Sequence, residues 1–123
     1  MIIAEIRQHK TKIHFKMITI KIKPLSVNEC WQGKRFKTPK YKSFERELLL
    51  KLKPKHVPKG KLLLTVFWGL SSKNADWDNP IKPFQDVIQK KFGFNDRWIY
   101  RGEIEKIDVP KGQEFIKFEL TKL

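Results

Sequence analysis

Three aspartates and one lysine are the residues of this chain best suited to chemistry. Asp76 and Asp78 are separated by one residue, Lys82 follows four residues later, and Asp96 comes further along the chain. Oxygen ligands with no cysteine or histidine nearby favour Mg²⁺ or Mn²⁺ over zinc, and Mg²⁺ usually binds a few carboxylates together with water and substrate phosphate. This ligand set suits phosphodiester hydrolysis, in which the Lys82 ammonium can stabilise the transition state or orient the attacking water.

The same residues also have ordinary structural explanations. Taken singly, each of these explanations is favoured, because such residue types concentrate in caps and turns. In these explanations Asp78 and Asn79 are helix caps, Asp76 is a solvated turn residue, Lys82 is a surface lysine and Asp96 is part of a turn that starts at Gly93. However, acids that cluster between an expected strand and an expected helix, in so basic a chain, call for a further reason.

The charge of the chain points to an anionic partner. Lysine and arginine total 27 against 13 acidic residues, a net charge of +14 in 123 residues. Nucleic acid is the leading partner on this ground, with solubility alone, a lipid surface or a ribosomal-type packing role as alternatives. The candidates for phosphate contacts flank a basic loop or the acidic residues, and about half of them are expected to be merely solvated: Lys34, Arg35, Lys37, Lys40, Lys42, Lys73, Lys90, Lys91, Arg97 and Arg101.

Composition predicts one folded domain spanning residues 1–123, since 40% of the residues are hydrophobic. Cys30 is the only cysteine, which excludes an intramolecular disulfide, and the three histidines lack zinc-ligand spacing with it. The longest nearly apolar run, Leu62–Leu70, is about half a membrane span, and Glu5 and Arg7 stand where a signal peptide needs apolar residues. We therefore expect a cytoplasmic protein with no membrane segment, no zinc and no small-molecule cofactor.

The first half of the chain predicts a strand, a loop and a helix. Residues 17–23 alternate as a half-buried strand does, and residues 25–37 form a polar, basic stretch typical of a long loop. Thr38-Pro39 is typical of a helix start, and an apolar stripe continues to Pro54. Residues 1–14 could be an extra strand or a mobile arm.

The second half predicts a central strand, a helix and two more strands. Residues 62–70 fit a strand that is covered on both faces or lies at a dimer contact. Asn79 is expected to cap a helix with Pro80 at its first position and Gly93 at its end. Strands at about 98–109 and 114–122 should form a terminal hairpin. The order β-loop-α-β-α-β-β indicates an α+β domain with two helices packed on a mixed sheet.

Taken together, the motifs resemble those of the RusA family of Holliday junction resolvases. The residues that carry the resemblance are Asp76-x-Asp78-Asn79-x-x-Lys82-x-x-x-Asp86, then Phe94-Asn95-Asp96 before a strand that contains Ile99. In the N-terminal half, Pro24-Leu25-Ser26-Val27-Asn28, Trp31 and Thr38-Pro39 are similar to the family's P-x-S-x-N loop and following T-P. The resemblance covers residues 18–122. The chain departs from the family at Asn95, where an acidic pair has its first acid, and at Pro80 and Pro83.

The resemblance implies a small α+β homodimer that resolves four-way DNA junctions by paired, symmetrical incision during recombination or repair of bacterial or phage DNA. A two-fold dimer suits a two-fold junction. It implies that Asp76, Asp78 and Asp96 bind Mg²⁺, or Mn²⁺ as a substitute, and that Lys82 is catalytic. Asn79 and Asp86 would support them, and Asn28 would contact DNA.

Two other functions stay open on the sequence alone. The departures at Asn95 and at the two prolines fit a binding module for branched DNA that does not cleave it. A basic structural or RNA-binding protein would use the acids as ordinary caps. Three tryptophans could stack on exposed bases, although packing in the core or at a dimer contact is favoured for large aromatics in so small a domain: Trp31, Trp77 and Trp98.

Overall fold

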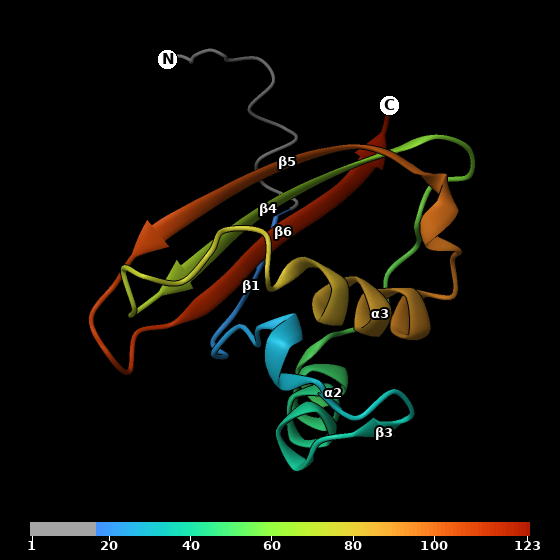
Figure 1. The fold of residues 1–123 in the computed structure, drawn as a ribbon. Helices are drawn as coiled ribbons and strands as arrows, with labels where there is room; N and C mark the ends of the chain where they lie inside the picture. Colours follow the sequence, from blue (N-terminus) through green and yellow to red (C-terminus); the bar gives the residue numbers. More distant parts are fainter. Residues whose placement is uncertain (1–16) are drawn as a thin grey trace.

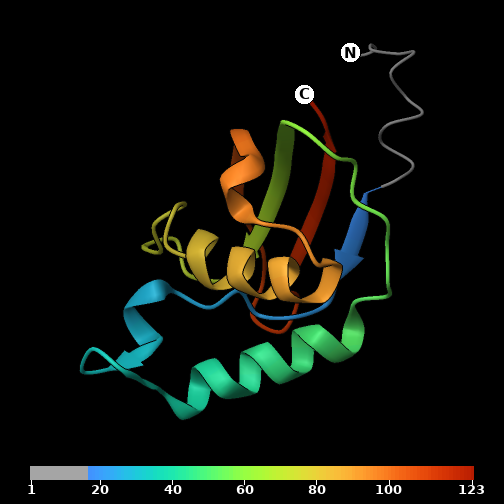
Figure 2. The same ribbon diagram turned by 90° about the vertical axis from the view of Figure 1, so that its right-hand side faces the viewer.

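The computed structural model describes residues 17–123, which form an α+β domain (Figures 1 and 2). The expectations for residues 1–14 lie outside this part. The main sheet has the strand order β1-β6-β4-β5 and a separate hairpin pairs β2 with β3. The bounds are β1 Ile18–Ile20, β2 Trp31–Gln32, β3 Phe36–Lys37, α2 Pro39–Lys51, β4 Leu62–Leu70, α3 Ile81–Phe92, β5 Ile99–Asp108 and β6 Phe115–Lys122, with 3-10 turns η2 at Val27–Glu29 and η3 at Asp96–Trp98.

Helix α2 begins and ends as its sequence predicts. The Thr38 side chain accepts a hydrogen bond from the backbone N–H of Tyr41, and Pro39 occupies the first helical position, which suits a residue that has no N–H to donate. The apolar stripe is buried and Leu52 ends the helix just before Pro54. This helix lies beside α3, on the side of α3 away from the sheet (Figure 2).

Helix α3 starts one residue later than expected, and the predicted Asn79 cap is wrong. Pro80 occupies the cap position and no side chain caps the helix. Asn79 is instead held by other partners, because its carbonyl accepts a hydrogen bond from Val27 N–H at 2.9 Å. Gly93 ends the helix with a φ of 72°, as expected of a glycine at a left-handed C-terminal position.

The predicted terminal hairpin is also wrong, although the turn near Pro110 is present. Strand β6 pairs antiparallel with β4, whereas β5 pairs parallel with β4 on its other side. A parallel neighbour needs a crossover connection, which α3 provides. The apolar residues of β6 require a central place under the helices, while the charged residues of β5 suit an edge strand.

The basic segment 25–37 is more ordered than the predicted loop. It contains η2 and the β2–β3 hairpin, whose strands have two residues each and are too short to produce a visible period. Trp31 meets the ring of Tyr41 edge-on with centroids 5.6 Å apart, and the Lys37 ammonium lies 5.0 Å from the centre of that ring. The hairpin therefore packs over Tyr41 at the start of α2.

Both helices lie over the same face of the main sheet, with α3 between the sheet and α2 (Figures 1 and 2). On that face, Phe84 packs edge-on against Trp68 and Phe118, with ring centroids 5.3 and 5.0 Å apart. The opposite face of β4 is only partly buried. The described helices therefore do not cover both faces of this strand, as one of the two expectations required. Trp31, Trp77 and Trp98 are 44%, 55% and 39% exposed, so they do not lie in the core, and their packing at a dimer contact stays a prediction. No helix among residues 17–123 is long and apolar enough to cross a membrane.

We expect Gly69→Ala to destabilise the fold by about 1–3 kcal/mol, as overpacking usually does. A Cβ at Gly69 would overlap the ring of Phe115 on the neighbouring strand, so this ring would have to move. Gly102→Ala on β5 is the matched control, because the nearest atom to its new Cβ is the Leu64 carbonyl oxygen at 4.0 Å. Urea unfolding measures both changes, and equal stabilities of the two variants would contradict the strand pairing described.

Candidate active site

Asp76 and Asp78 lie exposed on the connection from β4 to α3. Side chains of the main sheet hold this connection in place. The fully buried Trp68 indole donates to the carbonyl of Trp77 at 2.9 Å, between the two aspartates. The Lys106 ammonium, reaching from β5, donates to the carbonyls of Lys73 at 2.8 Å and Ala75 at 2.6 Å. The acidic loop is thus anchored to the sheet on both sides of Asp76.

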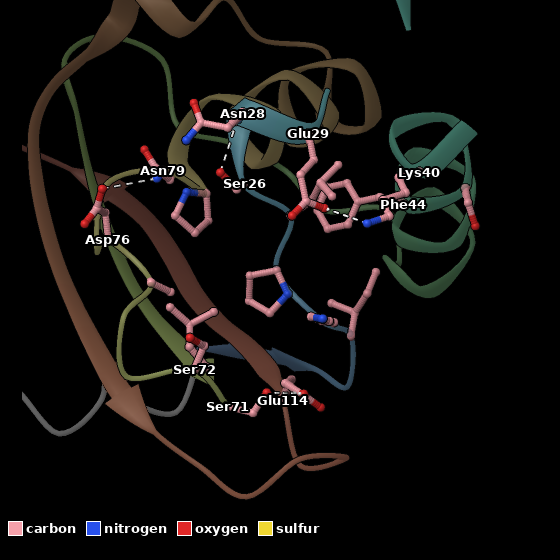
Figure 3. Close-up of a pocket in the computed structure, with 18 of the residues that line it drawn as sticks. Ser26, Asn28, Glu29, Lys40, Phe44, Ser71, Ser72, Asp76, Asn79 and Glu114 are labelled. Carbon is pink, nitrogen blue, oxygen red and sulfur yellow. Dashed lines mark hydrogen bonds and ion pairs between the residues drawn. The ribbon is translucent and has the colours of Figure 1, made fainter. Parts of the chain in front are cut away.

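Asn79 joins this acidic loop to the segment around η2. Its side-chain amide donates to Asp76 Oδ2 at 3.4 Å, while its carbonyl accepts from Val27 N–H. Figure 3 shows Asp76 and Asn79 close to Ser26 and Asn28, which belong to the segment before the basic hairpin. Asn28 and Asp76 therefore line the same cavity, and the backbone N–H of Asn28 donates to Ser26 Oγ at 3.1 Å.

Lys82 lies between two carboxylates on the exposed side of α3. Its ammonium is 3.1 Å from Asp86 Oδ1 and 3.4 Å from Asp96 Oδ2. The hydrogen bond that Lys82 donates to Asp86, with a further contribution from Asp96, raises the pKa of Lys82 above that of a free lysine. Lys82 therefore stays protonated throughout the neutral pH range and can place a positive charge on a bound phosphate.

Asp96 reaches Lys82 because the chain turns back along α3 after Gly93. Its carboxylate accepts a hydrogen bond from Gln85 Nε2 at 3.2 Å, and its backbone N–H donates to the side-chain oxygen of Gln89. Asn95 caps the 3-10 turn η3 by accepting from Arg97 N–H at 3.0 Å. Asparagine and aspartate are about equally good at such a cap, so Asn95 in place of an acid keeps the turn that aims Asp96.

Tyr41 is a member of this cluster that sequence analysis missed. Its buried hydroxyl donates to Asp86 Oδ2 at 3.2 Å, on the side of the carboxylate opposite to Lys82. Burial and the charge of Asp86 both raise the pKa of Tyr41, so the phenol remains a hydrogen-bond donor. The sequence showed Tyr41 only as part of an apolar helix stripe, which carries no sign of its polar end.

The acids fall into two groups and do not form one cluster. Asp76 bonds to Asn79 on the loop, whereas Asp86 and Asp96 hold Lys82. Among residues 17–123, no group of three acidic, histidine or cysteine side chains is arranged to hold a metal ion. The donor chemistry fits a hard divalent cation, but the expected grouping of Asp76, Asp78 and Asp96 is not present in the structure.

The basic candidates divide into side chains that have an ion pair and side chains that have none. Glu45 binds both Lys37 and Lys90, at 3.0 and 2.9 Å; burial opposes its charge, but these two ammonium groups lower the pKa of Glu45 overall. Lys40 pairs with Glu29 at 3.2 Å and Arg101 with Glu103 at 3.1 Å. Within the described residues, the candidates without an ion pair are Lys34, Arg35, Lys42, Lys73, Lys91 and Arg97.

A cavity of about 670 Å³ lies beside Asp76, where β4 ends (Figure 3). Four carboxylates and two lysines line it, so its charge is opposite to that of the chain as a whole: Glu29, Glu47, Asp76 and Glu114 against Lys23 and Lys40. Most of these groups already have partners, such as Lys40 for Glu29 and Ser71 for Glu114. The cavity is therefore suited to a cation more than to a phosphate.

Comparison with known proteins adds no family assignment. No protein-family profile matches this chain. No curated protein matches it either. What can be said of its function therefore depends on the motifs and on the geometry of the described residues.

We expect Lys106→Met to loosen the acidic loop with little change in the rest of the fold. The change keeps most of the aliphatic stem but removes the ammonium that binds two loop carbonyls, each contact contributing about 0.5–3 kcal/mol. Hydrogen exchange should become faster at residues 73–78 and stay unchanged in α2. Unchanged exchange in the loop would show that Lys106 does not hold it.

We also expect Asp86→Asn to lower the pKa of Lys82, because the mutation removes the carboxylate that contributes most to raising it. Stability from a lysine whose pKa is raised is present below the pKa of the unfolded chain and is lost as pH rises through the folded value. The wild-type protein should therefore lose this contribution only at alkaline pH, above the ordinary lysine value of about 10.4. NMR titration of the Lys82 side chain measures the shift, with Lys111, an exposed lysine outside the cluster, as the internal reference.

Proposed function

We propose that this chain is a Mg²⁺-dependent endodeoxyribonuclease that incises branched DNA, with four-way junctions as its substrate. The observation that carries the proposal is the position of Lys82 between Asp86 and Asp96, close in sequence to the exposed Asp76 and Asp78. A protonated lysine beside carboxylates that can bind a cation is suited to phosphodiester hydrolysis. The net charge of +14 supports nucleic acid as the partner.

Each residue of the candidate site has a distinct task in this proposal. Asp76, Asp78 and Asp96 would hold Mg²⁺, which would supply polarisation of the phosphate and activation of a water molecule. Lys82 stabilises the negative charge that develops on the phosphate oxygens as water adds to phosphorus and the ester oxygen leaves. Asp86 keeps Lys82 protonated and aimed, and Tyr41 orients Asp86. Asn79 positions Asp76 through their hydrogen bond.

Because the three acids are not gathered in advance, we propose that the ion and the DNA phosphate assemble the site together. Mg²⁺ is commonly bound by one or two carboxylates together with substrate phosphates. Movement of Asp96 toward the ion would release it from Lys82, which then faces the phosphate. It follows that Mg²⁺ alone binds weakly and that DNA raises the affinity for the ion.

We further propose that the protein acts as a homodimer in the cytoplasm, with each subunit cutting one strand. Two copies would double the charge of +14 and match the two-fold symmetry of the junction. Exposed cations around the basic hairpin, such as Lys34, Arg35 and Lys42, would contact phosphates and supply affinity without sequence preference.

A second function is favoured by one observation. The described residues hold no ready-made group of three metal ligands, and this fits a module that binds branched DNA without cutting it. The two functions differ in a single readout, because the binding module would bind junctions tightly yet leave them intact in both Mg²⁺ and Mn²⁺. Equal affinity for duplex DNA, RNA and junctions at matched salt would instead favour a basic structural protein.

We expect the wild-type protein to nick a synthetic four-way junction at paired positions in Mg²⁺ but not in EDTA. Asp78→Asn and Lys82→Met should each reduce the rate at least about 100-fold, the usual effect of removing a group that stabilises the transition state. Asp108→Asn and Lys111→Met, at exposed positions outside the cluster, are the matched controls and should cut normally. Normal cutting by Asp78→Asn would overturn the proposed active site.

A further inference from the structure

A second cavity, of about 550 Å³, lies at the end of the sheet where β4 begins. It is lined by the segment that enters β4, by the end of α3 and by η3, which lie at the same end of the sheet in Figures 1 and 2. The first cavity borders Leu70, the last residue of β4, whereas this one borders Leu62, the first. The two cavities therefore lie at opposite ends of the central strand.

The charge of this second cavity is positive. Lys55, His56 and Lys59 line one side of it, and none of the described residues that line it is acidic. The first cavity, which has a similar volume, differs in charge because four acidic residues line it. An anionic occupant is therefore favoured here, because it gains Coulomb attraction from the lining.

Three aromatic side chains also line the cavity. Phe92 and Phe94 are partly buried against the core and can serve as a rigid floor, while Trp98 at the rim is 39% exposed. The guanidinium of Arg97 lies 5.6 Å from the centre of the Trp98 ring. An exposed indole beside cations is the combination that proteins use to stack a base and bind the phosphate attached to it.

The cavity also lies close to the proposed active site. Asn95 lines it, and the next residue, Asp96, contacts Lys82. Along α3, Lys82 and Phe92 are ten residues apart, about 15 Å at 1.5 Å per residue. At about 3.4 Å per nucleotide of a stacked strand, roughly four nucleotides span this distance.

We propose that this cavity binds one unpaired nucleotide of a DNA strand that runs from the Lys82 cluster. The base stacks on Trp98 over the Phe92 and Phe94 floor, and its phosphate contacts Lys59. The placement of the nucleotide near the cut depends on the proposed nuclease function, whereas binding of single-stranded DNA in the cavity does not. Such a base would become available where the protein opens base pairs at the centre of a branched DNA, whereas an intact duplex keeps its bases paired.

Binding of a fluorescein-labelled single-stranded oligothymidylate, followed by anisotropy in EDTA, tests the proposal. Trp98→Ala should weaken binding by roughly 5- to 100-fold, the range seen when a stacking aromatic is removed. Tyr100→Ala is the matched control, because Tyr100 is a 58% exposed aromatic that does not line the cavity. Lys59→Glu should also weaken binding, and Lys111→Glu is its control for charge.

Two results would overturn the proposal. In the first, Trp98→Ala and Lys59→Glu bind oligothymidylate as tightly as their control variants do. The affinity would then come from the general positive charge of the protein. The other is binding of thymidine monophosphate as tight as that of the oligomer, which would assign the cavity to a free nucleotide. Because Lys59 is exposed, its variant keeps the test valid even if Trp98→Ala does not fold.

The two proposals can fail separately. If the wild-type protein does not cut junctions while Trp98→Ala and Lys59→Glu still weaken binding of the oligomer, the cavity stands without the nuclease function. If junctions are cut and neither variant changes binding of the oligomer, the nuclease function stands without the cavity. A 2-aminopurine base in the oligomer gives a further check, because stacking on Trp98 should quench its fluorescence and the alanine variant should restore it.

Discussion

The parallel pairing of β4 with β5 is the constraint on which the rest of the structure depends. Two adjacent parallel strands need a crossover, and α3 provides it by packing Phe84 and Ile88 on the sheet. Once that side of α3 is buried, Lys82 and Asp86 must face outward. The return of the chain to the start of β4 then carries Asp96 past Lys82. One strand pairing thus determines which polar groups meet at the candidate site.

Charge is distributed over this framework in a way that its net value does not reveal. The basic hairpin packs on Tyr41, whose hydroxyl contacts Asp86, so the proposed phosphate-binding surface and the acidic cluster share one support. Glu45 neutralises part of the basic surface near them by binding Lys37 and Lys90. These ion pairs decide which cations remain available to the proposed DNA partner.

Much of the fold could be predicted because local patterns and burial agree. The start of α2 at Thr38 and its end before Pro54 follow from capping and from the helical spacing of apolar residues, and Gly93 ends α3 as expected. Strand pairing could not be predicted, since β5 and β6 have short-range turn signals that fit a hairpin equally well. Their positions on either side of β4 were decided by burial, because β6 is apolar and largely buried whereas β5 is charged and largely exposed.

The sequence by itself determined the kinds of group available for chemistry and the turns that carry them. The Asp76-Asp78 spacing, the charge of +14 and the place of Lys82 on the polar side of a helix are all local properties. Tertiary structure alone decided that Lys82 contacts Asp86 and Asp96, that Tyr41 supports Asp86, and that Asp76 bonds to Asn79 apart from them. The reason is physical: local periodicity determines which way a side chain faces, whereas distances between side chains far apart in sequence depend on how the elements pack.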